Sequence, residues 1–498
     1  MVCVSFEGLV LSLILVPICF LPVTYIAGRR LGSKCGWVTF VPLLYSFLIS
    51  LILLSAVSLK GSIYVVFPLA PSVGLNFGFL IDGLSLPIVF TITLLCMVVS
   101  IFSIPYMEHH IGEDKAQHAA YYALYLLYAL GMVGTALSTN LIQFYFFWEL
   151  MLLPSWALIN IWGYGEREKI ALKYFIYTHV GALALLAGIL SLYSIFGTFE
   201  LPLIISLSKF IHVGDMIKWI TIAMFFGFAV KMAIVPLHTW LPDAHAEAPT
   251  PISALLSPAM IGLGGYATVR IIYSAFPEVW DSLSFILSLL ALITMVYSGA
   301  MALAQDDIKR LLAYSSASQM GYILMGLASA DPMGIGGAMY HYVSHGTCKA
   351  ILFMVAGAII LEAHGLRSIS KLGGLAKKMP LTATMALIGF LGIAGTPPLN
   401  GFQSEWLIFT GAFHGAIEAH DTLRLIVVAL GLIGSVLTAG YALWTMRRVF
   451  FGELREGLEE VHEPSIYVLA PMMVLAIFTV ILGIYPRLLM DLLTSFLS

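Results

Sequence analysis

The chain has 498 residues, is 60% hydrophobic and only 10% charged, and has a formal net charge of -3. An average soluble domain is roughly 25% charged, so this composition excludes an ordinary soluble fold, and the small net charge gives no indication of a nucleic-acid partner. The five cysteines form no CxxC pair, and no glycine-rich nucleotide loop follows a strand. We therefore expect no metal-binding and no cofactor-binding residue in this chain, so that any redox chemistry belongs to other chains.

Apolar runs repeatedly exceed eighteen residues, the length with which a helix crosses a bilayer core of about 30 Å. They predict an all-α integral membrane protein with about fourteen transmembrane helices, forming a single polytopic domain over residues 1–498. The predicted spans, in chain order, are 8–28, 37–59, 84–105, 119–138, 140–162, 170–197, 217–241, 250–274, 282–304, 311–330, 335–361, 380–415, 424–446 and 465–490. The first run has no basic leader and no A-x-A site, so we expect a retained helix rather than a cleaved signal.

The loops between these spans differ in their content of lysine and arginine. Of the 24 basic residues, fifteen fall on one side of the membrane, six on the other, and three within helices. Because basic residues gather in cytoplasmic loops, the richer side is predicted to face the cytoplasm, with both termini outside. We therefore expect a multi-pass protein of the cell (plasma) membrane.

Two of the predicted helices are interrupted. The seventh carries Pro236, and the twelfth carries Gly395 followed closely by two prolines. Backbone groups freed at membrane depth must be satisfied by protein or water, so such breaks usually line a cavity. The breaks lie five helices apart, and an odd offset inverts the second unit. We therefore expect two inverted five-helix repeats, helices 4–8 over residues 119–274 and helices 9–13 over residues 282–446.

Titratable side chains stand within several of these spans. A charge at membrane depth is costly, so it usually faces the bundle interior and has a function. The candidates for proton translocation are Glu149, Lys231, His345, Lys349 and Glu405. A buried lysine near a movable carboxylate can take up and release a proton, and histidine titrates near neutral pH. Static ion pairs are the alternative, but a purely structural pair is seldom placed beside a helix break.

Four further residues are possible members of the relay. They are Lys173, His179, His238 and His341. Lys173 could instead extend to the cytoplasmic face, and a satisfied interior histidine is as good an explanation for His179 and His341. Asp82, Asp306 and Asp307 lie at predicted helix ends, where capping or loop anchoring is the default expectation.

Two segments resemble a known family. The run VKMAIVPLHTWLPDAHAEAPTPISALL, from Val230 to Leu256, closely resembles the signature of the antiporter-like subunits of respiratory complex I and its relatives. The run DDIKRLLAYSSASQMGYILMG, from Asp306 to Gly326, does so as well. The resemblance covers essentially the whole chain. It implies a fourteen-helix bundle with inverted five-helix repeats and broken seventh and twelfth helices.

The resemblance also implies roles for individual residues. Glu149 matches the family's helix-5 glutamate, and Lys231 matches its helix-7 lysine. Glu405 occupies the twelfth-helix position, where glutamate is typical of the chain called M in bacteria and 4 in mitochondria. His345 and Lys349 match the H-x-x-x-K pattern of the multisubunit cation/proton antiporters and of some complex I chains.

One position departs from the family pattern. Members usually carry a lysine in helix 8, four residues before a tyrosine, and here Gly262 stands four residues before Tyr266. We expect that water fills the space beside Gly262, held in part by Ser257, or that His345 and Lys349 take over the missing base. The departure also indicates a divergent branch, such as an archaeal deazaflavin-dependent dehydrogenase or a membrane-bound hydrogenase.

Taken with the titratable residues, the resemblance implies an M/4-type proton-translocating subunit of a complex I-like pump. Flavin and iron–sulfur clusters would then lie in partner subunits, beside neighbouring antiporter-like chains. The chain would belong to a multisubunit oxidoreductase without holding a redox centre itself. Three alternatives stay open at this point: a D-type subunit of a multisubunit Na⁺/H⁺ antiporter, a subunit of a membrane-bound hydrogenase, and a non-transporting scaffold. The coupling ion is predicted to be the proton, since lysine has no acceptor for Na⁺.

Overall fold

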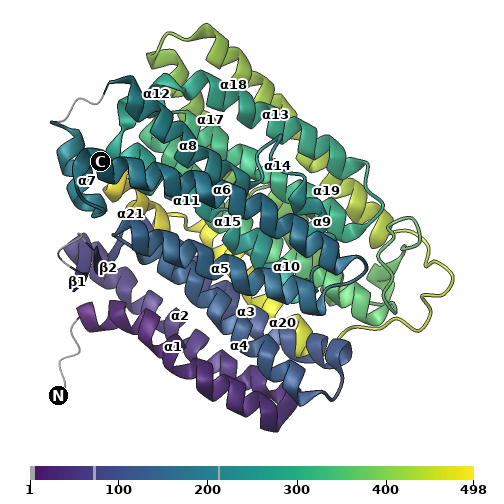
Figure 1. The fold of residues 1–498 in the computed structure, drawn as a ribbon. Coiled ribbons are helices and arrows are strands. Elements are labelled where there is room, and N and C mark those ends of the chain that lie inside the picture. Colours follow the sequence, from purple (N-terminus) through teal and green to yellow (C-terminus); the bar gives the residue numbers. More distant parts are fainter. Residues whose placement is uncertain (1–5, 71–74, 211–213, 498) are drawn as a thin grey trace.

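The computed structural model describes residues 6–70, 75–210 and 214–497, and most of them lie in helices that run roughly parallel to one another (Figure 1). The first long helices are α1 (Phe6–Leu31), α2 (Cys35–Lys60), α3 (Ser85–Ile111), α4 (Lys115–Leu137), α5 (Leu141–Trp162) and α6 (Arg167–Phe196). The middle of the chain forms α8 (Asp215–Met232), α9 (Trp240–Glu247), α10 (Thr250–Leu255), α11 (Leu263–Ala267), α13 (Ser284–Leu303), α14 (Ile308–Ala328) and α15 (Pro332–Glu362). The last part forms α16 (Pro380–Ile393), α17 (Asn400–Glu418), α18 (Thr422–Gly434), α19 (Val436–Val449), α20 (Ile466–Ile484) and α21 (Arg487–Leu497). Short helices α7 (Leu201–Ser208) and α12 (Pro277–Ser282) complete the set.

The all-α membrane fold and both predicted breaks are confirmed. Within the described residues, ten helical stretches are long and apolar enough to span a membrane, and one of them, Phe6–Lys60, contains both α1 and α2. The seventh and twelfth predicted spans are not among the ten, because each is divided into two shorter helices, α8 with α9 and α16 with α17. The tenth, α14, carries serine, glutamine and two basic residues. The total of fourteen spans therefore stays a prediction.

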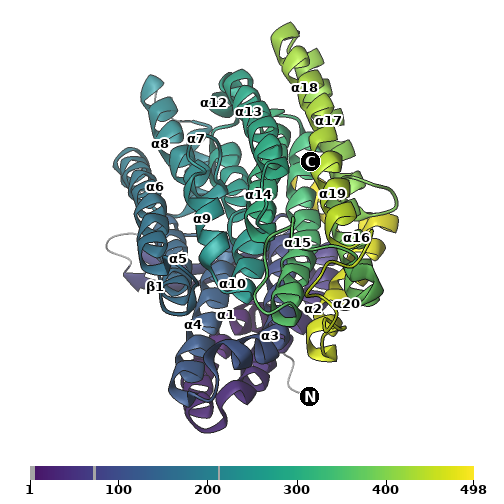
Figure 2. The same ribbon diagram turned by 90° about the vertical axis from the view of Figure 1, so that its right-hand side faces the viewer.

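Burial separates a central layer from a rim. The most apolar windows of α3 and α15 are 94% and 100% buried, whereas those of Phe6–Lys60 and Thr422–Val449 are 28% and 33% buried. In Figure 2, α15 lies between helices from the first part of the chain, such as α5 and α6, and helices from the last part, such as α16 and α19. Lipid is as apolar as leucine, so helices in a membrane associate through close packing. At Gly131 of α4, an added Cβ would lie 2.6 Å from the backbone nitrogen of Met151 in α5.

A β-hairpin between α2 and α3 was not predicted from the sequence. Strands β1 (Ser62–Ala70) and β2 (Leu75–Asp82) pair antiparallel and lie with α7 and α21 at one end of the bundle (Figure 1). The predicted capping role of Asp82 is confirmed, since its Oδ1 accepts hydrogen bonds from the backbone nitrogens of Leu84 and Ser85. Asp307 likewise caps α14, and Asp306 anchors the loop at Ser370. The first strand, SIYVVFPLA, is apolar without a regular alternation and contains Pro68, which explains why the hairpin was missed.

The hairpin is joined to the helices by a buried ion pair. Arg270 donates from Nη1 to Oδ2 of Asp82 at 2.8 Å and from Nη2 to Oδ1 at 2.5 Å, and both residues are 7% exposed. Arg270→Met should destabilise the bundle by about 3–5 kcal/mol, because the Asp82 carboxylate would stay buried without its cation. The measurement is the thermal unfolding of the purified complex. Lys169→Met is the control, since its partner Glu166 and Lys169 itself are 71% and 80% exposed; equal melting temperatures for both variants would contradict the expectation.

Candidate functional site

Lys231 lies in the last turn of α8, directly before the first break. The residue is 1% exposed, its Nζ stands 5.3 Å from the centre of the Trp148 ring, and it has no hydrogen-bond partner among the described residues. The helix stops because Ala233 adopts a left-handed conformation, with φ of 54°. Freed backbone groups are met by side chains: Trp240 Nε1 donates to the Val230 carbonyl at 3.0 Å. A buried ammonium of this kind is costly, so its charge depends on the groups around it.

Glu149 of α5 lies near Lys231 but does not pair with it. Its Oε2 is 3.2 Å from Nδ1 of His179 on α6, and its Oε1 is buried with no partner in the described chain. The Glu149 carboxylate still interacts electrostatically with Lys231. Glu149 is 17% exposed and His179 is 38% exposed at the side-chain level, so this pair reaches the side of the bundle.

We expect Glu149→Gln to reduce proton uptake severely and Glu149→Asp to retain part of it. Glutamine keeps an acceptor for His179 but removes the charge that acts on Lys231, whereas aspartate keeps the charge with a shorter reach. Proton uptake by vesicles containing the assembled complex measures both variants. A fully active glutamine variant would show that the charge is not needed, and the pair would then be structural.

Helix α15 places three titratable residues on one face. His341, His345 and Lys349 are spaced by four residues, and each is at most 1% exposed. Lys349 Nζ donates to Ser315 Oγ at 2.5 Å and to the Leu312 carbonyl at 3.2 Å. Nε2 of His345 has no partner among the residues described, and its ring lies within electrostatic range of His341 and Lys349.

The second break brings Glu405 to the same region. Helix α16 ends at Ile393, α17 begins at Asn400, and Glu405 lies in the second turn of α17. Its Oε1 is buried and accepts no hydrogen bond from the described part of the chain. Next to Glu405, Ser404 Oγ is 2.9 Å from Nδ1 of His341, whose tautomer decides the donor.

Hydroxyl groups connect Lys349 with the surroundings of Glu405. Ser315 donates to the hydroxyl of Tyr441 at 2.6 Å, and Tyr441 interacts electrostatically with Glu405. The sequence of groups is therefore a lysine, a serine, a tyrosine and a carboxylate. Hydroxyls both donate and accept hydrogen bonds, so this arrangement can pass a proton along.

Two of the possible relay residues lie at the first break or beside it and form no hydrogen bond with Lys231. Lys173 Nζ bonds to Asp243 Oδ2 at 2.7 Å and to the Thr239 carbonyl at 2.8 Å, and it is 34% exposed. It thus ties α6 to the start of α9 and makes no bond to Lys231. His238 is 5% exposed and lies in the break itself, packed against the rings of Tyr297 and Tyr314.

Sequence reasoning missed two buried residues next to this region. His245 of α9 is fully buried, stacks on Phe353 at 4.9 Å, and neither ring nitrogen has a partner in the described residues. Lys309 falls in the loop between the predicted spans 282–304 and 311–330, but it is fully buried in the first turn of α14 and donates to the backbone carbonyl of Ala248. His245 interacts electrostatically with both Lys309 and Lys349. The signal that could have pointed to His245 is its place inside the family signature from Val230 to Leu256. For Lys309 the only signal was its position at the start of a predicted helix.

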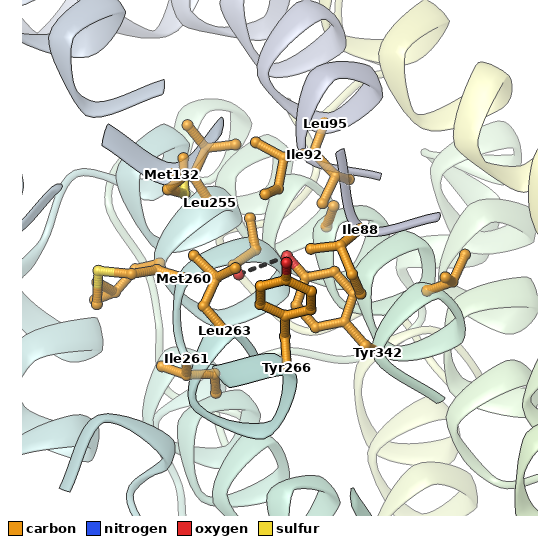
Figure 3. Close-up of a cluster of buried hydrophobic side chains, with 14 of the residues drawn as sticks. Ile88, Ile92, Leu95, Met132, Leu255, Met260, Ile261, Leu263, Tyr266 and Tyr342 are labelled. Atoms are coloured by element: carbon orange, nitrogen blue, oxygen red, sulfur yellow. Dashed lines mark hydrogen bonds between the residues drawn. The ribbon is translucent and has the colours of Figure 1, made fainter. Parts of the chain in front are cut away.

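The space expected beside Gly262 is filled by a side chain, so the expectation of water there was wrong, and the alternative, that His345 and Lys349 replace the missing base, stays a prediction. A Cβ at Gly262 would lie 2.3 Å and 2.7 Å from the Cδ2 and Cε2 atoms of Tyr342, which comes from α15. Figure 3 shows Tyr342 among apolar side chains such as Ile88 and Leu263. The Tyr342 hydroxyl donates to the Ala259 carbonyl at 2.8 Å. Ser257, expected to hold water, hydrogen-bonds with Ser316 at 2.6 Å.

A membrane bundle with two broken helices, buried lysine and histidine residues and half-buried glutamates is typical of ion-translocating membrane proteins. Two family models match the chain: "NADH:quinone oxidoreductase/Mrp antiporter, TM" over residues 138–438 and "NADH-Ubiquinone oxidoreductase (complex I), chain 5 N-terminus" over residues 68–116. The chain belongs to the NADH:quinone oxidoreductase/Mrp antiporter membrane-subunit family.

Named relatives agree with this assignment. F(420)H(2) dehydrogenase subunit M of Methanosarcina mazei is 34% identical, covering 97% of this chain and 96% of its own. NADH-quinone oxidoreductase subunit M of Rhodobacter capsulatus is 32% identical, covering 94% of this chain and 90% of its own. A chain in the structure of respiratory complex I from Thermus thermophilus with bound NADH has a TM-score of 0.85 and 27% identity, covering 98% of this chain and 99% of that chain.

Proposed function

We propose that this chain is the M-type proton-translocating subunit of a complex I-like, redox-driven membrane pump. The observation that carries the proposal is the set of buried and half-buried titratable residues that ends at the two helix breaks, with Lys231 at the first and Glu405 at the second. The subunit M names of the relatives from Methanosarcina mazei and Rhodobacter capsulatus support the choice of complex.

The proposed route has two parts. In the first, a proton reaches Lys231 under the control of Glu149, whose own position is held by His179. In the second, Lys349 passes a proton through Ser315 and Tyr441 toward Glu405. His245 and His345 extend the second part, since both interact electrostatically with Lys349 and His345 also interacts with His245.

Lys349 replaces the lysine that the family usually carries in helix 8. The place of that lysine is occupied by the Tyr342 ring, which comes from α15. The same helix carries the fully buried Lys349. Conserving a central base while changing the helix that supplies it would keep the route intact. We retain His238 and His341 as possible members of the relay, and Lys173 as a residue near its entrance.

The partners of this chain are other membrane and peripheral subunits, including neighbouring antiporter-like chains. Electron transfer, with flavin and iron–sulfur clusters, takes place in those partners and drives proton movement here. The location is the plasma membrane, with both termini outside, and the two predicted repeats, 119–274 and 282–446, each contribute one broken helix. The coupling ion is the proton, because the buried cationic side chains would repel Na⁺.

The test is ion transport by the purified intact complex in liposomes. We expect an electron-donor-dependent proton flux that a protonophore collapses, together with flavin and iron–sulfur components in the co-purifying subunits. A flux that follows a sodium gradient and survives the protonophore would favour the Na⁺/H⁺ antiporter instead. No change in flux on replacing any buried lysine would favour a scaffold.

A further inference from the structure

A large cleft lies outside the buried titratable region. It has a volume of about 1570 Å³ and is formed by the loop after α15, the end of α19 and the loop after α19. These loops lie at the end of the bundle opposite the β-hairpin (Figure 1). The four lysine and arginine residues on its walls are Lys371, Arg447, Arg448 and Arg455. Two carboxylates, Glu453 and Glu456, also line it, so the walls carry an excess of positive charge.

Most of this positive charge is not neutralised within the chain. The side chains of Lys371, Arg447 and Arg455 form no hydrogen bond or ion pair with the described residues. Arg448 alone is partly neutralised, with its Nη2 3.5 Å from Oδ1 of Asp306. Charges that lack an internal partner attract an anion from outside, and guanidinium groups match phosphate oxygens in geometry.

The position of the cleft relative to the membrane limits what that anion can be. Trp444, Arg447 and Arg448 are spaced to share one face at the end of α19, a helix within a candidate membrane span, and Phe451 follows two residues after the helix ends. Trp444 is 48% exposed and Phe451 is 52% exposed, and the neighbouring Leu443 is 55% exposed. Aromatic and basic residues at the end of a span are typical of the level of the lipid headgroups.

We propose that this cleft binds the phosphate group of an anionic membrane phospholipid. Arg447, Arg455 and Lys371 hold the phosphate oxygens, while the acyl chains lie along the exposed apolar side of α19 beside Leu443 and Trp444. The phosphate contacts would resemble those for a free phosphate ion, but the apolar surface next to the arginines favours the lipid. Binding there would fasten the loop after α19 to the membrane surface.

The test uses the intact complex in phosphatidylcholine nanodiscs that contain increasing fractions of phosphatidylglycerol. Bound phosphatidylglycerol is counted by mass spectrometry for the native complex and for Arg447→Gln and Arg455→Gln. Each substitution should weaken retention about fivefold, since each basic side chain near an anionic lipid contributes that much. Arg30→Gln and Lys34→Gln are matched controls, because these basic residues are exposed, lie on the side of the membrane predicted for the cleft, and are not part of it.

Three results would overturn the proposal. One is equal lipid retention by the cleft variants and the native complex at comparable assembly. Another is an equal loss in the Arg30→Gln and Lys34→Gln controls, which would mean general surface attraction. The third has two parts: inorganic phosphate displaces phosphatidylglycerol as effectively as a short-chain phosphatidylglycerol does, and Trp444→Ala leaves lipid retention unchanged. That result would make the cleft a site for free phosphate.

Discussion

Replacing Lys231 by methionine should abolish most proton translocation while the complex still assembles. The ammonium is fully buried at the end of α8 and has no hydrogen-bond partner within the described chain. Methionine fills a similar volume and removes a costly buried charge, so the bundle should not be destabilised. Loss of a group that takes up and releases a proton is expected to slow transport by about 100-fold or more.

Proton uptake and electron transfer are measured together for Lys231→Met in proteoliposomes. We expect uptake to fail, and the melting temperature of the complex to be unchanged or higher. Lys169→Met serves as the control, since Lys169 is 80% exposed and pairs only with Glu166. Uptake at the native level would remove Lys231 from the route.

Lys349→Met should impair transport as strongly as Lys231→Met. Lys349 is fully buried, and its hydrogen bond to Ser315 leads on to Tyr441 and the surroundings of Glu405. Without the amine, the second part of the route loses its proton donor, and proton transport is again expected to slow by about 100-fold. Proton transport at the native level by Lys349→Met would show that the two parts of the proton route are connected without Lys349.

His345→Ala should also reduce proton transport, and by more than the loss of side-chain packing explains.

A rescue variant distinguishes a relocated base from a merely structural lysine. Gly262→Lys alone should destabilise the bundle, because the Tyr342 ring occupies the position of the new side chain. Gly262→Lys combined with Tyr342→Ala provides the space, and in the Lys349→Met background it should restore part of the proton uptake. A double substitution that folds but restores nothing would mean that a base at position 262 cannot replace Lys349.

The sequence alone determined the class of the protein and the positions of its helix breaks. Apolar runs of membrane length, Pro236 and Gly395 are local features, and each acts on the backbone where it stands. The same holds for the titratable residues inside the spans, because a charge in an apolar run is visible without knowledge of its neighbours. The β-hairpin was missed because its first strand is apolar without a regular alternation and contains Pro68.

Only the tertiary structure decided which of these residues meet. Glu149 pairs with His179 rather than Lys231, Tyr342 fills the space beside Gly262, and Lys309 is buried rather than exposed. Each of these facts depends on how one helix is rotated and shifted against another. Several of the helices are apolar on nearly every side, so their sequences do not specify which face is turned toward which neighbour. Side-chain packing between helices settles those rotations, and with them the route that a proton can take.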